Sequence, residues 1–161
     1  MARKVDIKGI KIVATNRRAR HEFEILETWE AGLVLQGTEV KALREGHVNL
    51  GDAYGEIRDG EGWIVKMHIG PYEQGNRENH EPFRRRKLLL HRREMRKILP
   101  KLEEKGLTLV PLRLYFKDGR AKVEIALARG KKTYDKRHAI AERTATREAE
   151  RDLGRRLKGI H

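Results

Sequence analysis

The two stretches on either side of residues 117–120 constrain the fold more than any other part of the chain. Residues 107–116 and 121–129 alternate apolar and polar side chains, which is the period of a β-strand. Between them, Asp118-Gly119 supplies the positive φ angles that a tight hairpin turn needs. The sequence therefore predicts a long antiparallel hairpin. The apolar residues expected on one face of it are Val110, Leu112, Leu114, Phe116, Val123, Ile125 and Leu127.

Other segments with a strand or helix period complete the expected fold. Phe23, Ile25 and Trp29 share one face of a half-buried strand, which Ala31-Gly32 interrupts as a bulge or sharp bend. A hairpin is expected over residues 54–58 and 63–69, with Ile57 pairing near Trp63 and Val65. Two helices are also expected, one over 38–45 capped by Thr38 and one over 91–105 that Pro100 kinks or breaks. Together they predict a mainly β fold. About six strands with two to three helices favour a small antiparallel barrel of the oligonucleotide-binding type.

The chain divides into three parts by composition. Its 161 residues allow one domain with a proper core, which we place at residues 10–130, after a flexible N-terminal arm over residues 1–9. Gly130 follows the last strand pattern and predicts the point where the backbone leaves the sheet. Residues 131–161 form a basic C-terminal tail whose alanine stripe buries little, so we expect it to become helical on binding.

A large positive charge indicates the class of partner. The formal net charge is +13, and such an excess repels itself unless a polyanion is near. No apolar run approaches the roughly 20 residues of a membrane span, and residues 1–9 lack the apolar segment of a signal peptide, so a cytoplasmic protein with no membrane contact is expected. The absence of cysteine excludes disulfides, thiol catalysis and thiolate metal sites.

Enzymatic chemistry finds little support in the sequence. Neither phosphate-binding glycine motif occurs, and no two histidines have the i,i+3 or i,i+4 spacing of a helical metal site, so no cofactor or metal is expected. A metal-dependent nuclease is the enzymatic alternative. It would use Glu39, which begins a helix beside several cations and is otherwise an acid favoured by the helix N-terminus.

Basic stretches with interleaved aromatic rings predict RNA binding. The stretches are residues 17–20, 84–87 and 131–137, and the rings suited to stack on unpaired bases are His21, Phe83, His91 and Tyr134. The second stretch forms a basic lip in front of three leucines that anchor it to the core. Charge alone equally predicts a general RNA-binding protein of low discrimination, whereas the expected barrel favours structured RNA.

Five segments resemble the SsrA-binding protein family, SmpB, in order and at similar spacing along nearly the whole chain. They are Asn16-Arg-Arg-Ala-Arg-His21, Glu30-Ala-Gly32, Gln36-Gly-Thr-Glu-Val-Lys41, Arg86-Lys-Leu-Leu-Leu90 and Gly130-Lys-Lys-Thr-Tyr-Asp-Lys-Arg137. The resemblance implies a non-enzymatic barrel that binds the tRNA-like domain of transfer-messenger RNA (tmRNA). It also implies that the protein takes this RNA into ribosomes stalled on messages without a stop codon, a process called trans-translation.

The resemblance further implies the partners and the site. The expected partners are tmRNA in its alanyl form with elongation factor Tu, and the 16S rRNA decoding centre and empty mRNA channel of the ribosome, with the protein a monomer. The residues expected to bind RNA are Asn16, Arg17, Arg18, Arg20, His21, Glu30, Glu39, Lys41, Arg44, Arg84, Arg86, Lys87, Leu89, His91, Lys122 and Gly130. The tail residues expected at the decoding centre are Lys131, Lys132, Tyr134, Asp135, Lys136 and Arg137. Some members carry His at the position of Tyr134 and Asn at that of His91.

Overall fold

The computed structural model describes residues 9–72, 79–104 and 106–131. The chain separates into two compact units, residues 1–130 and 131–161, and the first is described by itself. No helix in the described ranges is long and apolar enough to cross a membrane. The elements in chain order are β1 (Ile10–Thr15), α1 (Arg17–Glu22), β2 (Phe23–Leu33), α2 (Gly37–Arg44), β3 (Val48–Asn49), β4 (Tyr54–Arg58), β5 (Glu61–Val65), β6 (His68–Ile69), β7 (Arg86–Leu89), α3 (Arg92–Leu102), β8 (Leu107–Lys117) and β9 (Arg120–Gly130).

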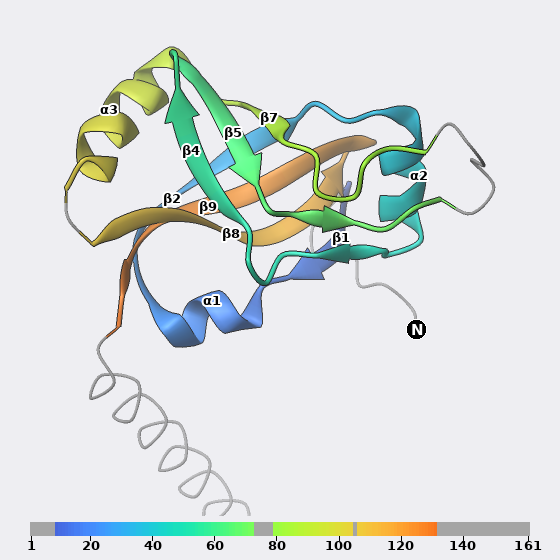
Figure 1. Cartoon of the computed structure of the whole chain (residues 1–161), viewed down its shortest axis with the longest axis horizontal. Coiled ribbons are helices and arrows are strands. Elements are labelled where there is room, and N and C mark those ends of the chain that lie inside the picture. Colours follow the sequence, from blue (N-terminus) through green and yellow to red (C-terminus); the bar gives the residue numbers. More distant parts are fainter. Residues whose placement is uncertain (1–8, 73–78, 105, 132–161) are drawn as a thin grey trace, which may run out of the picture. The chain divides into compact units, whose positions relative to one another are not determined.

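Six strands form a closed antiparallel ring (Figure 1). The hydrogen-bonded order is β1-β8-β4-β5-β7-β2-β9, and an additional pairing of β8 with β9 closes the ring while β1 lies outside it against β8. Gly55 of β4 is paired with Leu109 of β8, and a Cβ at residue 55 would lie 2.9 Å from the Leu109 Cβ. Only a glycine allows this closing contact. The mainly β barrel predicted from the sequence is therefore confirmed.

The two Asp-Gly turns form hairpins as predicted. Lys117 is paired with Arg120 across the first turn, where Asp118 and Gly119 have φ angles of 51° and 79°. The second hairpin is tighter than expected. Arg58 is paired with Glu61, so Ile57 lies opposite Gly62, one residue before Trp63, while Val65 lies opposite Tyr54.

The expected strand over residues 63–69 was wrong because the backbone turns at Lys66. Its φ angle is 61°, a conformation that ends a regular strand. The segment is therefore divided into β5 and the short β6, which is paired with β3 in a separate two-stranded sheet.

Two register shifts divide the core into two clusters, and the sequence pattern did not reveal either. In β8 the shift lies between Pro111 and Arg113, so Val110 and Leu112 pack against Ala19 of α1 outside the ring, while Leu114 faces the interior. The prediction that Val110, Leu112, Leu114 and Phe116 share one face was wrong, because a bulge reverses the alternation.

The second shift lies in β2, between Ile25 and Glu27. Ile25 therefore packs in the outer cluster and Trp29 in the inner one, although a regular strand would put them on the same face. The interruption predicted at Gly32 was wrong, since β2 continues through that residue to Leu33. The bend lies near Leu26 instead.

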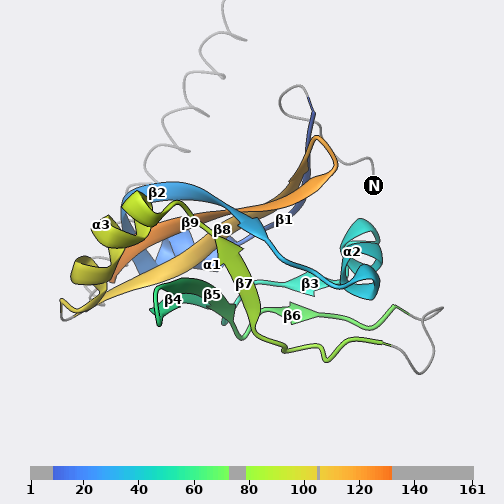
Figure 2. The ribbon, with the colours of Figure 1, turned by 90° about the horizontal axis from the view of Figure 1, so that it is seen from above.

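The helices differ from the prediction mainly at their ends. Gln36, rather than Thr38, caps α2, and its backbone N–H donates to the side chain of Glu39 at 2.8 Å. The Thr38 hydroxyl instead lies 2.9 Å from Nδ1 of His80. α3 continues through Pro100 to Leu102. α2 and α3 lie at opposite ends of the barrel (Figures 1 and 2).

Candidate nucleic-acid interface

Leu89, Gly32 and Lys122 form a row across three neighbouring strands. Gly32 of β2 is paired with Leu89 of β7 on one side and with Lys122 of β9 on the other. Directly paired residues project from the same face of a sheet, so the two side chains flank a residue that has none. Leu89 is 54% exposed, which is unusual for a strand leucine next to a core. We call these three residues the Leu89 row.

Gly32 sets the spacing of the Leu89 row. A Cβ at residue 32 would lie 3.2 Å from Cβ and 3.3 Å from Cδ1 of Leu89, closer than side chains normally pack. The missing side chain lets β7 approach β2 and leaves bare backbone between an exposed leucine and a lysine. The row is therefore flat in its centre, with an apolar group at one end and a cation at the other.

Glu30 lies beside the Leu89 row on the same face, two residues before Gly32 on β2. The hydroxyl of Tyr115, a residue paired with Lys122, donates a 2.5 Å hydrogen bond to Oε2 of Glu30. Nζ of Lys117 lies 3.4 Å from Oε1. The Tyr115 hydrogen bond is the main reason why the pKa of Glu30 is lowered, and Lys117 and Lys122 act in the same direction. The carboxylate is thus held ionised.

The same contact fixes the protonation of Tyr115. Burial, and then the hydrogen bond to Glu30, raise the pKa of the Tyr115 hydroxyl, so it stays protonated and donates. A hollow of about 230 Å³ lies on this face, lined in part by Thr28, Glu30, Arg113 and Tyr115. Its polar groups come from β2, β8 and β9, the last contributing Glu124.

These groups can hold an unpaired nucleotide by three different interactions. An ionised carboxylate only accepts hydrogen bonds, so Glu30 is suited to an N–H group of a base or to a ribose 2′-hydroxyl. Leu89 offers an exposed apolar surface to a base face, and Lys122 offers a cation to a phosphate. Bare backbone at Gly32 lets a planar group come close between them.

Comparison with known proteins identifies the family. The model of the SmpB protein family matches residues 13–155. The SsrA-binding protein of Parafrankia sp. (strain EAN1pec) is 62% identical over 151 residues, covering 94% of this chain and 96% of that protein. The SsrA-binding protein of Desulforudis audaxviator is 61% identical over 149 residues, covering 92% and 95%. The chain belongs to the SmpB family.

A solved structure supports the same placement. It is described as "tmRNA-SmpB: a journey to the center of the bacterial ribosome", and the matching chain is 55% identical with a TM-score of 0.65. The match covers 74% of this chain and 85% of that chain. Since both sequence and fold agree, the residues that SmpB proteins are expected to use can be located in this barrel.

The SmpB-like stretch from Arg84 to Lys87 is not the free basic lip that its sequence suggests. Each of its four cations is paired with a carboxylate: Arg84 and Arg86 with Glu39, Arg85 with Glu56, and Lys87 with Glu61. These partners lie far away in sequence. In this fold the stretch therefore offers little unpaired charge, and its expected contacts with RNA stay a prediction.

Glu39 and Arg86 form a buried ion pair that attaches α2 to the first residue of β7. Both side chains are fully buried, and the Arg86 guanidinium also donates to the backbone oxygens of Met67 at 2.7 Å and Arg84 at 2.9 Å. Burial alone would raise the pKa of Glu39, but hydrogen bonds from Arg84, the Gln36 backbone and Arg86 lower it. Burial lowers the pKa of Arg86. Both side chains are used inside the barrel to hold α2 against β7, and their expected contacts with RNA stay a prediction.

The Asn16–His21 segment of this SmpB chain forms α1 on an outer face of the barrel. Asn16 is buried and caps the helix, with its Oδ1 accepting from the Ala19 N–H at 3.1 Å, and its expected contact with RNA stays a prediction. Its Nδ2 donates to the Pro111 carbonyl at 2.9 Å, which ties α1 to the bulge in β8. Arg17, Arg18 and Arg20 are exposed as predicted, and His21 is half-buried.

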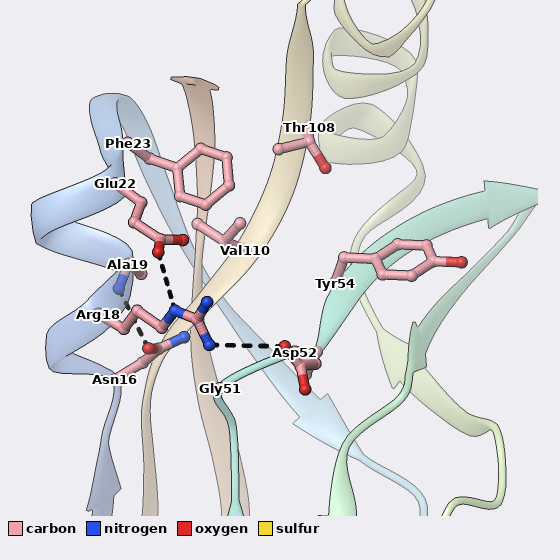
Figure 3. A pocket seen from close by; sticks show the side chains of 11 residues that line it. Asn16, Arg18, Ala19, Glu22, Phe23, Gly51, Asp52, Tyr54, Thr108 and Val110 are labelled. Atoms are coloured by element: carbon pink, nitrogen blue, oxygen red, sulfur yellow. Dashed lines mark hydrogen bonds and ion pairs between the residues drawn. The ribbon is translucent and has the colours of Figure 1, made fainter. Parts of the chain in front are cut away.

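A hollow of about 280 Å³ separates α1 from the segment that leads into β4 (Figure 3). Arg18 reaches across it, with Nε 2.8 Å from Glu22 and Nη1 3.7 Å from Asp52. Phe23 and Val110 line its apolar side. The Arg18 guanidinium is thus held between two carboxylates, which leaves it less charge to offer a phosphate than its exposure suggests.

The remaining expected residues are spread over other elements. Lys41 and Arg44 are exposed on α2, where Lys41 lies 5.5 Å from the Tyr72 ring and Arg44 lies 4.9 Å from the Phe116 ring. His91 caps α3 and is exposed. Gly130 is the last residue of β9, paired with Phe23, and Lys131 follows it half-buried. The tail residues Lys132, Tyr134, Asp135, Lys136 and Arg137 lie outside the described residues.

Two residues of this SmpB interface were missed by sequence reasoning, Tyr115 and Lys117. Tyr115 was passed over because the alternation of β8 left it as an ordinary outward-facing residue. Pro111 was the available signal, because a proline inside a strand pattern marks a bulge or an edge and so a change of face. The contact of Tyr115 with Glu30 depends on strand pairing and has no signal in the local sequence.

Proposed function

We propose that this chain binds the tRNA-like domain of tmRNA and delivers it to stalled ribosomes for trans-translation. The relatives are SsrA-binding proteins, and the matching solved chain belongs to a tmRNA-SmpB complex in the bacterial ribosome. The observation that carries the proposal is the Leu89 row with Glu30 beside it. An exposed leucine, an oriented carboxylate and a lysine on one face suit structured RNA with unpaired bases better than a plain duplex.

The proposal includes the parts that lie outside this face. The barrel over residues 10–130 holds the RNA, and the tail over residues 131–161 acts at the 16S rRNA decoding centre and in the empty mRNA channel, with Asp135, Lys136 and Arg137 as its first contacts. The chain works in the cytoplasm as a monomer, with alanyl-tmRNA and elongation factor Tu, and carries no catalytic activity of its own. The relatives' name, SsrA-binding protein, supports the RNA-binding part of this proposal.

Binding to two RNAs tests the proposal. We expect the tRNA-like domain to bind more tightly than an unrelated RNA hairpin of equal length at moderate salt. Equal affinity for both would contradict the proposal and favour a general RNA-binding protein, whose affinity falls steeply with salt and does not depend on the RNA.

A pair of leucine variants tests the surface itself. Leu89 and Leu26 are both exposed strand leucines, at 54% and 43%. We expect Leu89→Ala to weaken binding of the tRNA-like domain about tenfold, because burying a leucine side chain against a base face contributes about 1.5–3 kcal/mol. Leu26→Ala, which removes the same atoms elsewhere on the surface, should leave the affinity unchanged. Equal losses in the two variants would place the RNA on a different face.

The nuclease alternative loses its leading residue in this fold. Glu39 is fully buried and ion-paired with Arg84 and Arg86, so it offers no carboxylate to a metal ion in solvent. Incubation of the protein with RNA and Mg²⁺ or Mn²⁺ tests the point directly, and we expect the RNA to remain intact.

A further inference from the structure

Four cations on the outer face of α3 have no carboxylate partner among the residues that the structure describes. Arg92, Arg93, Arg96 and Lys97 are all exposed and take part in no ion pair within the described ranges. They contrast with the Arg84–Lys87 stretch, where every cation is paired. We call these four residues the α3 cluster.

The positions of these cations oppose the stability of the helix. Arg92 and Arg93 are the first two residues of α3, where the positive end of the helix dipole disfavours a cation. Arg92 with Arg96, and Arg93 with Lys97, are like charges at i,i+4, and such pairs destabilise a helix. Folding alone therefore gives no reason for this arrangement.

The opposite face of α3 fixes the helix to the barrel. Ile98 is fully buried, and Leu102 packs against the inner cluster. At the C-terminal end, Nζ of Lys101 lies 3.1 Å from the Glu27 carboxylate of β2. The helix is held at both its middle and its end, so the α3 cluster is presented on a rigid support rather than a mobile one.

Nearby acids form no ion pair with the α3 cluster among the residues that the structure describes. Asp59 and Glu61 line a groove of about 450 Å³ together with Arg92 and Arg96, but Glu61 is paired with Lys87 at 3.0 Å. Glu94 accepts a hydrogen bond from the His91 backbone N–H at 2.9 Å and so belongs to the helix cap.

The α3 cluster also begins close to the Leu89 row. Only Leu90 and His91 separate Leu89, the last residue of β7, from Arg92. Cations four residues apart are separated by about 6 Å along a helix, a spacing close to that of successive phosphates on one RNA strand. A membrane surface would require a broad apolar face beside the cations, whereas Ile98 and Leu102 of α3 are used by the core.

We propose that the α3 cluster binds the phosphate backbone of structured RNA, as a second contact separate from the Leu89 row. The inference rests on the proposed function, since it takes RNA as the partner. The Leu89 row reads bases and ribose, while the α3 cluster contributes affinity that does not depend on sequence. The backbone it contacts belongs either to the bound tmRNA or to ribosomal RNA.

A matched pair of double variants tests the α3 cluster. Arg93→Gln/Lys97→Gln removes two of its charges, and Lys66→Gln/Arg120→Gln removes two exposed charges from the end of β5 and the start of β9. Binding is measured between 50 and 300 mM salt against two probes, the isolated tRNA-like domain and purified ribosomes. Each lost phosphate contact lowers the slope of log K against log salt by about 0.9, so two contacts lower it by about 1.8.

We expect the α3 variant to lose affinity and slope against at least one probe and the control variant to lose neither. The probe that responds identifies the RNA. The melting temperature of the α3 variant should equal or exceed that of the wild type, because unfavourable charges have been removed. Equal slopes for the two variants against both probes would overturn the inference. The wild type would still discriminate between the tRNA-like domain and a hairpin, so the proposed function is judged separately.

Discussion

The hydroxyl of Tyr115 and the carboxylate of Glu30 meet across 85 positions of sequence in a 2.5 Å hydrogen bond. The bond forms because β2 and β8 both pair with β9, which places outward-facing residues of the three strands side by side. This hydrogen bond lowers the pKa of Glu30, and the Tyr115 hydroxyl donates its proton to the Glu30 carboxylate. Tyr115 therefore orients a residue that we propose to contact RNA, without being exposed itself.

Replacing Tyr115 tests this orientation. In Tyr115→Phe the pKa of Glu30 should rise toward its ordinary value, because the main cause of its lowering is removed. In the wild type, ionised Glu30 stabilises the fold at pH values above the ordinary carboxyl pKa, and this stabilisation is lost as the pH falls through the lowered pKa. In the variant, the Glu30 carboxyl should therefore become protonated at a higher pH. Carbon-detected NMR titration of Glu30 measures the shift. Affinity for the tRNA-like domain should fall several-fold, and an unchanged pKa would refute the assigned role of the hydroxyl.

Gly32 provides a second prediction. Gly32→Ala places a methyl group 3.2 Å from the Leu89 Cβ, so β7 and β2 must separate, and overpacking of this kind costs about 1–3 kcal/mol. Gly37→Ala is the control, since nothing lies within 4 Å of a Cβ there. Chemical denaturation should show a lower free energy of unfolding for Gly32→Ala and no decrease for Gly37→Ala. If Gly32→Ala were as stable as the wild type, the two strands would not be held at the distance described.

The buried pair of Glu39 and Arg86 provides a third prediction. Glu39→Gln leaves the Arg86 charge buried without its partner, which should lower the free energy of unfolding by about 3 kcal/mol or more. Glu61→Gln removes one partner of the exposed ion pair with Lys87, and it should change the free energy of unfolding by less than about 1 kcal/mol. Because the pKa of Glu39 is lowered by folding, its stabilisation is lost in the wild type as the pH falls through that lowered value. In Glu39→Gln, the free energy of unfolding should lack this part of its dependence on pH.

Truncation tests the proposed division of labour between barrel and tail. A chain ending at Gly130 should bind the tRNA-like domain nearly as tightly as the full chain, because the Leu89 row and Glu30 remain in place. It should fail to support tagging on stalled ribosomes in a reconstituted translation assay. A large loss of RNA affinity on truncation would show that residues 131–161 hold the RNA as well.

The sequence predicted the β8–β9 hairpin because both of its signals are local, the alternation and the Asp118-Gly119 turn. It did not predict which side chains share a face. Bulges near Leu26 and Pro111 reverse the alternation, and they allow Val110 and Leu112 to pack under α1 while Leu114 remains inside. A bulge depends on what lies across the strand, so it is visible only once the partner strand is known.

The candidate site shows the same limit. Resemblance to a family supplied Glu30, Leu89 and Lys122 as separate positions, but only strand register places them around Gly32. The Arg84–Lys87 stretch shows the opposite case. Local sequence presents four free cations, whereas the fold pairs each of them with a carboxylate from a distant element. Charge counted along the chain therefore overstates the charge that this surface offers to RNA.

The closing of the ring has a consequence for how the protein is made. Phe23 pairs with Gly130 and Gly32 with Lys122, so β2 leaves the ribosome long before its partner β9 has been translated. During that interval its open edge can pair with another chain, and contacts of such sequence separation form slowly. A copy whose synthesis stops before Arg120 can never close its barrel. Such an incomplete chain is an aggregation hazard of the kind that ribosome rescue exists to remove.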